Sequence, residues 1–248
     1  MQKLRVLDLF SGIGGFSLGL ERTGGFETVA FCELNQFCQR VLAHHWPSVK
    51  VYKDVRKLTA TVLERDGIRP NAICGGFPCQ DISSGGKGEG IHGSRSSLFF
   101  EIVRLADELG PDFIILENVA ALLGRGIDVV LGALAEIRFD AEWHCIPASA
   151  LGYPHERDRI WIAAYPSALR RSEGGWSAEG WGRSVWDRLH RGPSSWAVAA
   201  NNDEVRSEFL RLVDGLPNHV DQLAAYGNAV VPEIPEIIGN AILAARAA

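Results

Sequence analysis

The 248-residue chain has only five cysteines and one methionine, and it contains no long apolar run. The cysteines, at positions 32, 38, 74, 79 and 145, form no Cys-x-x-Cys pair and have no histidine at metal-ligand spacing. This pattern argues against a disulfide scaffold and a zinc site, so we expect no metal. No stretch reaches the roughly 20 apolar residues of a membrane-spanning helix, and the first ten residues lack the pattern of a signal peptide. We therefore expect a cytoplasmic protein without membrane contact.

Basic charge is also scarce, with 25 Lys and Arg against 30 Asp and Glu and a net charge of −5. Indiscriminate binding to nucleic acid relies on a basic footprint that neutralises phosphates. The charge balance argues against such binding but leaves a local basic surface open. A hydrophobic content of 46% and a charged content of 22% are typical of a soluble globular chain, and they exclude fibrous and disordered classes.

Short β-rich runs alternate with helical stretches over the first two thirds of the chain. This alternation predicts an α/β fold with a mainly parallel sheet that is covered by helices on both faces. The predicted strands are residues 4–10, 28–33, 50–52, 72–74, 113–116, 142–146 and 159–164. The predicted helices include residues 98–109, 204–213 and 235–248. The last begins at Pro235, because proline fits the first turn of a helix but not its interior.

A glycine-rich segment follows the first predicted strand. Residues 8–15 read Asp-Leu-Phe-Ser-Gly-Ile-Gly-Gly and open a helix, at the place where an open α/β sheet binds nucleotides. The dinucleotide fingerprint is incomplete, since Ser17 stands at its third glycine position. Glu33 ends the second strand about twenty residues further on, where an acid can bind two ribose hydroxyls. The alternative is a plain strand-to-helix turn with a solvated glutamate.

A second unusual loop, Gly-Gly-Phe-Pro-Cys-Gln at residues 75–80, follows the fourth predicted strand. A lone cysteine is usually a buried core residue. Cys79, however, follows a proline in a glycine-flanked loop, where a core residue has little reason to be, so we interpret it as a nucleophile. Residues 81–97 are dense in glycine and serine, which suits a lid over substrate, although a disordered loop has the same composition.

Further polar groups adjoin the later strands. Glu117 follows the apolar strand 113–116, which suits a role as a general acid. The alternative is that this carboxylate stabilises the N-terminus of a helix. Arg157 and Arg159 are two residues apart and share one strand face, so they can either converge on a ligand or form surface ion pairs.

These motifs, in this order, resemble the DNA cytosine-5 methyltransferases that use S-adenosylmethionine, over residues 4–165 and 205–247. The resemblance implies a class I, Rossmann-like methyltransferase fold. It divides the chain into a catalytic domain at 1–165, a small target-recognition region at 166–225 and a returning segment at 226–248. It also implies methyl transfer to C5 of a cytosine flipped out of double-stranded DNA, through a covalent bond between Cys79 and C6 of the base.

The resemblance also implies roles for individual residues. The catalytic residues would be Pro78, Cys79, Gln80, Glu117, Arg157 and Arg159. The residues that bind S-adenosylmethionine would be Phe10, Ser11, Gly12, Gly14, Gly15, Glu33, Asp54, Leu98, Asn228 and Val230. His155 stands where the family usually has glutamine, which is a departure from its pattern.

The region after the catalytic motifs differs in composition. Residues 166–202 hold four of the seven tryptophans, and residues 166–200 carry five arginines against three acids, a net charge of +2. The stretch is much shorter than the family's usual recognition segment and resembles compact, phage-like members. Arginine beside tryptophan suits phosphate and base contacts. We expect nucleic acid to contact Ser83, Lys87, Arg183, Arg188 and Arg191. The alternative is a small tryptophan core that the arginines merely solvate.

Three rival functions remain open: an RNA or tRNA cytosine-5 methyltransferase, a catalytically silent nucleic-acid-binding regulator, and a nicotinamide oxidoreductase. Residues 226–232, Tyr-Gly-Asn-Ala-Val-Val-Pro, favour DNA over tRNA. Cys79 and Glu117 argue against a silent regulator, and Ser17 argues against the oxidoreductase. We expect a monomer that acts on DNA, with a cognate restriction endonuclease as a candidate partner.

Overall fold

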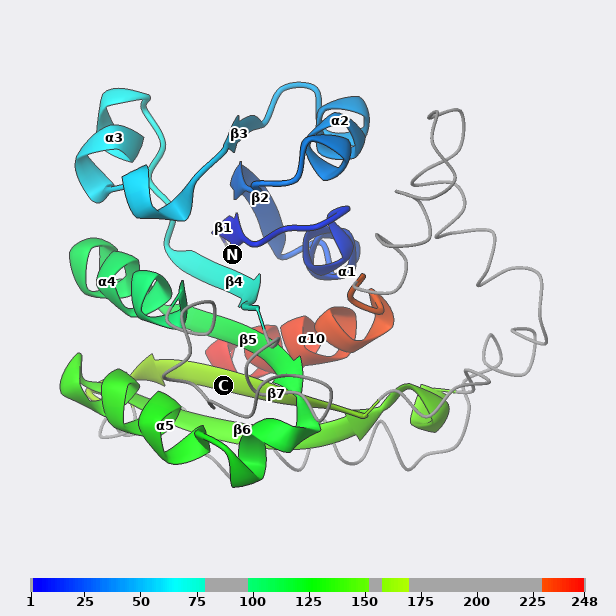
Figure 1. Ribbon diagram of the computed structural model, residues 1–248, viewed down its shortest axis with the longest axis vertical. Coiled ribbons are helices and arrows are strands. Elements are labelled where there is room, and N and C mark those ends of the chain that lie inside the picture. The colour runs from blue at the N-terminus through cyan, green and yellow to red at the C-terminus, as the bar shows by residue number, and fades with distance from the viewer. Residues whose placement is uncertain (1, 79–97, 152–157, 170–228, 248) are drawn as a thin grey trace.

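The computed structural model describes residues 2–78, 98–151, 158–169 and 229–247 (Figure 1). In this part of the chain, seven strands form one sheet in the order β3-β2-β1-β4-β5-β7-β6. The strands are β1 (Leu4–Leu9), β2 (Phe26–Cys32), β3 (Lys50–Tyr52), β4 (Ala72–Gly76), β5 (Phe113–Val119), β6 (Phe139–Pro147) and β7 (Asp158–Pro166). Strands β1 to β5 pair in parallel, and β7 runs antiparallel to both β5 and β6. The predicted mainly parallel α/β sheet is confirmed.

Helices cover both faces of this sheet, as predicted (Figure 1). They are α1 (Gly15–Arg22), α2 (Gln36–His45), α3 (Ala60–Arg65), α4 (Phe99–Leu109), α5 (Ile127–Glu136) and α10 (Glu233–Ala247). Short 3-10 helices lie at η1 (Val55–Lys57), η4 (Ala120–Gly124) and η5 (Ala148–Leu151). None of the described helices is long and apolar enough to cross a membrane.

The core is divided by the sheet into two main apolar clusters. Alternate side chains of β1, β4 and β5 point to opposite faces, because successive residues of a strand alternate. Leu7, Ile73 and Ile114 pack in the cluster that α3, α4 and α5 cover. Their neighbours along the strands pack in the cluster that α1 and α10 cover. Burial on both faces explains why the central strands are almost continuously apolar.

Most predicted boundaries shift by one to three residues in the structure, and two of these shifts have a clear physical reason. Strand β2 begins at Phe26 rather than at residue 28, because Phe26 pairs with Leu4 in the ladder and is buried. Helix α10 begins at Glu233 rather than at Pro235, so this proline is the third residue of the helix and still lies in its first turn, where no intrahelical donor is lost. The helix predicted over 204–213 lies outside the described residues.

The strand order positions the site. Strand β1 has β2 on one side and β4 on the other, so the chain leaves β1 and β4 in opposite directions across the sheet. Ligands of open α/β sheets bind at the carboxyl ends of strands at such a switch point. The glycine-rich loop after β1 and the segment Phe77–Pro78 after β4 therefore begin at the same edge. The antiparallel strand β7 places its first residues at this edge too, since Arg159 pairs with Val119 at the end of β5.

Candidate active site

The glycine-rich loop between β1 and α1 has an unusual backbone. Gly12 and Gly14 have φ angles of 54° and 89°, a left-handed conformation that glycine adopts without steric cost. Phe10 also has a positive φ of 55°, which is rare for a bulky residue and marks a constrained turn. An added Cβ on Gly12 would meet nothing within 4 Å, so open space adjoins the loop at this point. The sequence prediction that glycines let a ligand approach the backbone agrees with this geometry.

Glu33 lies directly after β2 and faces this loop. Its Oε2 accepts a hydrogen bond of 2.8 Å from the backbone N–H of Gly12, and its Oε1 accepts one of 2.7 Å from Asn35. Burial raises the pKa of Glu33, and the hydrogen bonds from backbone amides oppose that rise. A carboxylate offers about four lone-pair sites, so capacity remains for a hydroxyl donor. The structure thus brings Glu33 into contact with the glycine loop, and its expected role in binding ribose stays a prediction.

Ser17 has a role that sequence analysis missed. Its hydroxyl donates a 2.7 Å hydrogen bond to Oδ2 of Asp8, and both side chains are fully buried. Asp8 is the next-to-last residue of β1, just before the loop, and burial raises its pKa to about 7. The residue that interrupts the dinucleotide fingerprint therefore holds a buried carboxyl group beneath the loop. A serine nine residues after an aspartate gives no local signal, because the pair meets only when α1 packs on β1.

Trp46 is another supporting residue that the sequence did not reveal. It follows α2, and its indole nitrogen donates a 2.9 Å hydrogen bond to Oε2 of Glu21. A Cβ on Gly14 would lie 2.7 Å from the Trp46 ring, closer than real contacts allow. Gly14 is therefore required both for its positive φ and for the close approach of this indole.

Asp54 and Leu98, both predicted to bind cofactor, occupy other positions at this end of the sheet. Asp54 caps η1 after β3, and its carboxylate accepts two 2.9 Å hydrogen bonds from the Arg56 guanidinium. These bonds lower the pKa of Asp54. Leu98 precedes α4 and packs against the core cluster on that face. Within the described part of the chain, no hydrogen bond or ion pair joins either residue to Glu33 or the glycine loop.

Glu117 and Arg159 form an ion pair at the end of the sheet. Arg159 Nε lies 2.8 Å from Glu117 Oε1, and the Glu117 side chain is only 12% exposed. Glu117 is a residue of β5, which extends to Val119, so it does not begin a helix. Sequence analysis left open a ligand contact or a surface ion pair for Arg159, and the structure instead shows a partly buried pair with this carboxylate. The pair forms because β7 runs antiparallel to β5, which strand propensities cannot reveal.

Gly76 and Asn118 connect Glu117 with the segment that leads to Cys79. A Cβ on Gly76 would lie 2.9 Å from Glu117 Oε2, so the absence of a side chain makes room for the carboxylate. The buried Asn118 amide donates a 3.2 Å hydrogen bond to the carbonyl of Phe77. This bond ties the end of β5 to the backbone immediately before Pro78. The end of β5 is therefore fixed against the residues that immediately precede Cys79.

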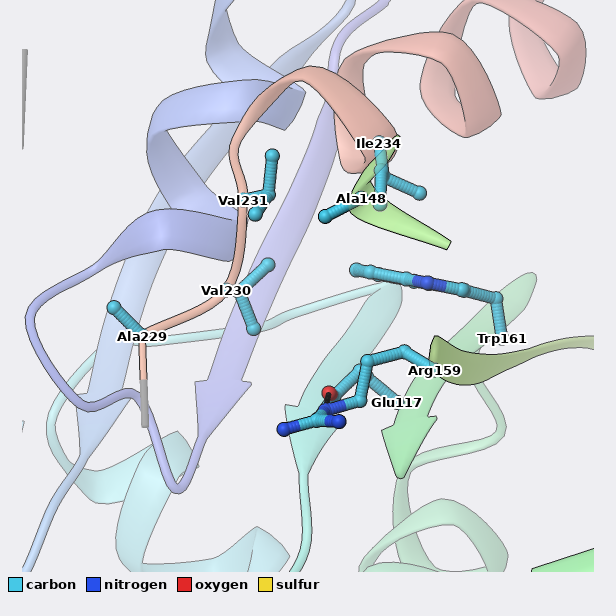
Figure 2. Close-up of a pocket in the computed structure, with 8 residues that line it drawn as sticks. All are labelled: Glu117, Ala148, Arg159, Trp161, Ala229, Val230, Val231 and Ile234. Atoms are coloured by element: carbon cyan, nitrogen blue, oxygen red, sulfur yellow. Dashed lines mark ion pairs between the residues drawn. The ribbon is translucent and has the colours of Figure 1, made fainter. Parts of the chain in front are cut away.

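The segment before α10 packs against the start of α1, next to the glycine loop. A Cβ on Gly15 would collide with the carbonyl oxygen of Val230, and one on Gly19 would collide with that of Pro232. Figure 2 shows Val230 between the glycine-rich loop and the Glu117–Arg159 pair. A small pocket lies here, lined by Glu117, Ala148, Arg159, Trp161, Ala229, Val230, Val231 and Ile234. This pocket lies between β5, β7 and the returning segment.

The remaining predicted residues lie outside the described part of the chain. They are Cys79, Gln80, Ser83, Lys87, Arg157, Arg183, Arg188, Arg191 and Asn228. Among the residues that are described, no group of three or more His, Cys, Asp or Glu side chains could hold a metal ion.

Comparisons with known proteins agree with this architecture. A methyltransferase of Entamoeba histolytica, EhMeth, has a similar fold, with a TM-score of 0.70 and 14% identity over 98% of this chain and 99% of that chain. The Type II methyltransferase M2.BsuMI of Bacillus subtilis (strain 168) is 33% identical over 65% of this chain and 42% of its own length. M.HhaI, a Type II methyltransferase of Haemophilus parahaemolyticus, is 32% identical over 67% of this chain and 50% of its own length. The chain thus spans half or less of these curated relatives.

The sheet order, with its antiparallel β7 and its glycine loop after β1, is that of the S-adenosylmethionine-dependent methyltransferase fold. Within this class, the model of the C-5 cytosine-specific DNA methylases matches residues 4–184. The chain therefore belongs to the C-5 cytosine-specific DNA methylase family. The resemblance that its motifs suggested is confirmed at the level of the family.

Proposed function

We propose that this protein transfers a methyl group from S-adenosylmethionine to C5 of a flipped-out cytosine in double-stranded DNA. The observation that carries the proposal is the Glu117–Arg159 ion pair at the sheet edge where the glycine loop and the entry to the Cys79 loop also begin. Family membership supports the same assignment. The catalytic domain would be residues 1–165, with 166–225 as the recognition region and 226–248 as the returning segment.

The residues at the glycine loop fit the proposed cofactor. Open space adjoins Gly12, where Glu33 contacts the loop, and this arrangement suits the ribose of S-adenosylmethionine. Phe10, Ser11, Gly14, Gly15, Asp54, Leu98, Asn228 and Val230 would complete its binding site. The chemistry that the cofactor supplies when bound is an electrophilic methyl group attached to sulfur.

The protein's own residues would make cytosine reactive. C5 of cytosine is a weak nucleophile, so the Cys79 thiolate adds to C6 while Glu117 donates a proton or hydrogen bond to N3. The electron pair of the C5–C6 double bond then becomes available at C5, which accepts the methyl group. Loss of the C5 proton returns an electron pair to the ring and expels Cys79. Arg159 holds Glu117 by an ion pair at 2.8 Å, and Arg157, Pro78 and Gln80 would complete the base pocket.

The test compares Cys79→Ser with Cys145→Ser, a matched change at an exposed cysteine of β6. We expect Cys79→Ser to abolish methylation, because a neutral hydroxyl is a far weaker nucleophile than a thiolate, while affinity for S-adenosylmethionine stays within about twofold. Cys145→Ser should behave as the parent. The parent should also form a covalent complex with DNA that contains 5-fluorocytosine, whose C5 fluorine cannot leave as a proton. Parental turnover by Cys79→Ser would refute the proposed mechanism.

Matched DNA and tRNA substrates, assayed with tritiated cofactor, decide which nucleic acid is methylated. Methylation of DNA alone supports the proposal, and methylation of tRNA alone would replace it with an RNA methyltransferase. Bisulfite sequencing of a plasmid from expressing cells then reads out the target. Protection of that plasmid from restriction enzymes tests a role in a restriction–modification system.

A further inference from the structure

Trp161, in strand β7, lies beside the Glu117–Arg159 pair. It is directly opposite Glu117 in the β5–β7 ladder, so the two side chains leave the same face of the sheet as cross-strand neighbours. The indole is 1% exposed and meets the ring of Phe16 edge to face, with 5.4 Å between the ring centroids. Figure 2 shows it between the ion pair and the side chains of Ala148 and Ile234. The catalytic scheme above gives this tryptophan no role.

The indole N–H of Trp161 is buried, and no acceptor is found for it in the part of the chain that the structure describes. A buried donor without an acceptor costs about 1 to 3 kcal/mol, so native proteins rarely leave one unsatisfied. An ordered water commonly supplies the missing partner where a polar site has room for it. Trp161 lines the small pocket between β5, β7 and the returning segment, which has space for about one water molecule.

The lining of this pocket determines how a water would be oriented. Ala148, Ala229, Val230, Val231 and Ile234 contribute apolar surface, so the ion pair and the indole supply its polar side-chain groups. The indole and the Arg159 guanidinium are donors only, whereas the Glu117 carboxylate is an acceptor. A water that accepts a hydrogen bond from the indole therefore has its own two protons available, and Glu117 is the side-chain acceptor that lines the pocket.

We propose that this pocket binds a single water molecule, which accepts a hydrogen bond from Trp161 Nε1 and donates one to the Glu117 carboxylate. Trp161 is then a positioning residue that acts on Glu117 through the water, complementing Arg159 on Oε1. Because both Arg159 and the water hold the Glu117 carboxyl group, it stays oriented toward the cytosine while bonds in the cytosine ring form and break. This inference rests on the proposed function for its catalytic consequence, but the water site itself is independent of the reaction.

The first experiment uses Trp161→Phe, which keeps an aromatic ring against Phe16 and removes only the donor. Trp143→Phe is the matched control, because Trp143 lies on β6 and is 42% exposed. We expect a crystal structure of the full chain to show the water in the parent and in Trp143→Phe, and to show none in Trp161→Phe. We also expect Trp161→Phe to lower kcat about tenfold, the effect of one bridging hydrogen bond, with the Kd for S-adenosylmethionine within twofold.

A second variant keeps the indole and displaces the water. Ala148→Val fills the pocket with two methyl groups, and we expect the same fall in kcat if thermal denaturation shows a folded protein. A crystal structure of the parent with a protein acceptor on Trp161 Nε1, or with no water there, would overturn the inference. So would parental kcat in both variants. Absence of methylation by the parent would instead refute the proposed function, because the crystallographic result does not depend on activity.

Discussion

Asp8 is the residue whose ionisation is most tightly linked to the fold. Its side chain is fully buried in β1, where it accepts the Ser17 hydroxyl on Oδ2 while Oδ1 has no partner among the described residues. Burial is the main cause that raises its pKa to about 7, the nearby Glu33 charge adds to the rise, and hydrogen bonds from Ser17 and Cys74 oppose it. A neutral carboxyl group at this point avoids a buried charge beneath the glycine loop.

This shift predicts how stability depends on pH. The folded state binds the Asp8 proton more tightly than the unfolded chain, whose pKa is 3.8, so the stabilisation is present at low pH and is lost as pH rises toward 7. Asp8→Asn removes this dependence. When the pH is raised from 5 to 8, the free energy of unfolding of Asp8→Asn should increase relative to that of the parent by roughly 3 kcal/mol. Urea denaturation at both values measures the gain.

Asp107→Asn provides the control for that experiment, since Asp107 is an exposed acid on α4. It replaces a carboxyl group by an amide at an exposed position, so it controls for the substitution itself without the burial of Asp8. Equal pH dependence in the parent and in Asp8→Asn would show that Asp8 is already ionised in the folded protein at pH 5.

Sequence analysis could place some residues at the site from their position along the chain, although it could not test their roles. Glu33 could be predicted because an acid at the end of a strand lies at the ligand-binding edge. Ser17 and Trp161 could not, because their partners, Asp8 and Glu117, come from other elements that meet only after packing. The register between strands and the packing of helices depend on the whole core, so they cannot be predicted from local composition.

Among the elements near the site, α1 packs closely against the returning segment. Gly15 and Gly19 let the carbonyl groups of Val230 and Pro232 approach the helix, and Arg22 forms an ion pair of 3.5 Å with the buried Glu233. Glycine inside a helix normally costs about 0.5 to 1 kcal/mol relative to alanine. Here the close approach explains its presence.

Gly19→Ala tests this contact. The new methyl group would meet a backbone carbonyl that must shift, so we expect a loss of roughly 1 to 3 kcal/mol in stability and a weaker affinity for S-adenosylmethionine. Gly132→Ala in α5 is the control, because its Cβ would meet nothing within 4 Å, and it should stabilise by about 0.5 to 1 kcal/mol. Denaturation and calorimetry measure both effects. If Gly19→Ala proved as stabilising as Gly132→Ala, the returning segment would not pack as described.

The strands of the sheet could largely be predicted, whereas the neighbours of β7 could not. Every predicted strand is present, since buried parallel strands have apolar runs bounded by loops. The insertion of β7 between β5 and β6, antiparallel to both, has no signal in its sequence. That insertion brings Arg159 beside Glu117, a partner from another strand, which is why the sequence could not decide between a ligand contact and a surface ion pair.

In the whole molecule, the described sheet and helices belong to the proposed catalytic domain, apart from α10, which lies in the returning segment. The family model extends to residue 184, beyond the last strand of the sheet. Residues 166–202 are then the stretch in which sequence recognition would lie, and they number about 37. So short a segment can present few side chains to the major groove, and we expect a target of about two to four base pairs around the cytosine.

We predict that Arg183, Arg188 and Arg191, which flank tryptophans in the most basic part of the chain, contact DNA phosphates. Contacts with phosphate control salt dependence, and each one lost lowers the slope of log affinity against log salt by about 0.9. Replacing all three arginines with alanine should therefore weaken DNA binding and flatten its salt dependence. Affinity for S-adenosylmethionine should not change, because none of the three arginines is among the residues proposed to bind the cofactor, such as Glu33 at the glycine loop.

A matched triple variant, with Arg40, Arg65 and Arg69 replaced by alanine, removes the same charge from exposed positions of the catalytic domain. It should bind DNA with a salt slope closer to that of the parent than the first variant does. Fluorescence anisotropy over a range of salt concentrations compares the three proteins. If the first triple variant bound and methylated DNA as the parent does, those arginines would only solvate a tryptophan core. Recognition of the target sequence would then depend on residues 80–97 or on Arg157 and Arg159. Separately, a bisulfite map that shows a strict target of six or more base pairs would contradict the prediction of a short recognition segment.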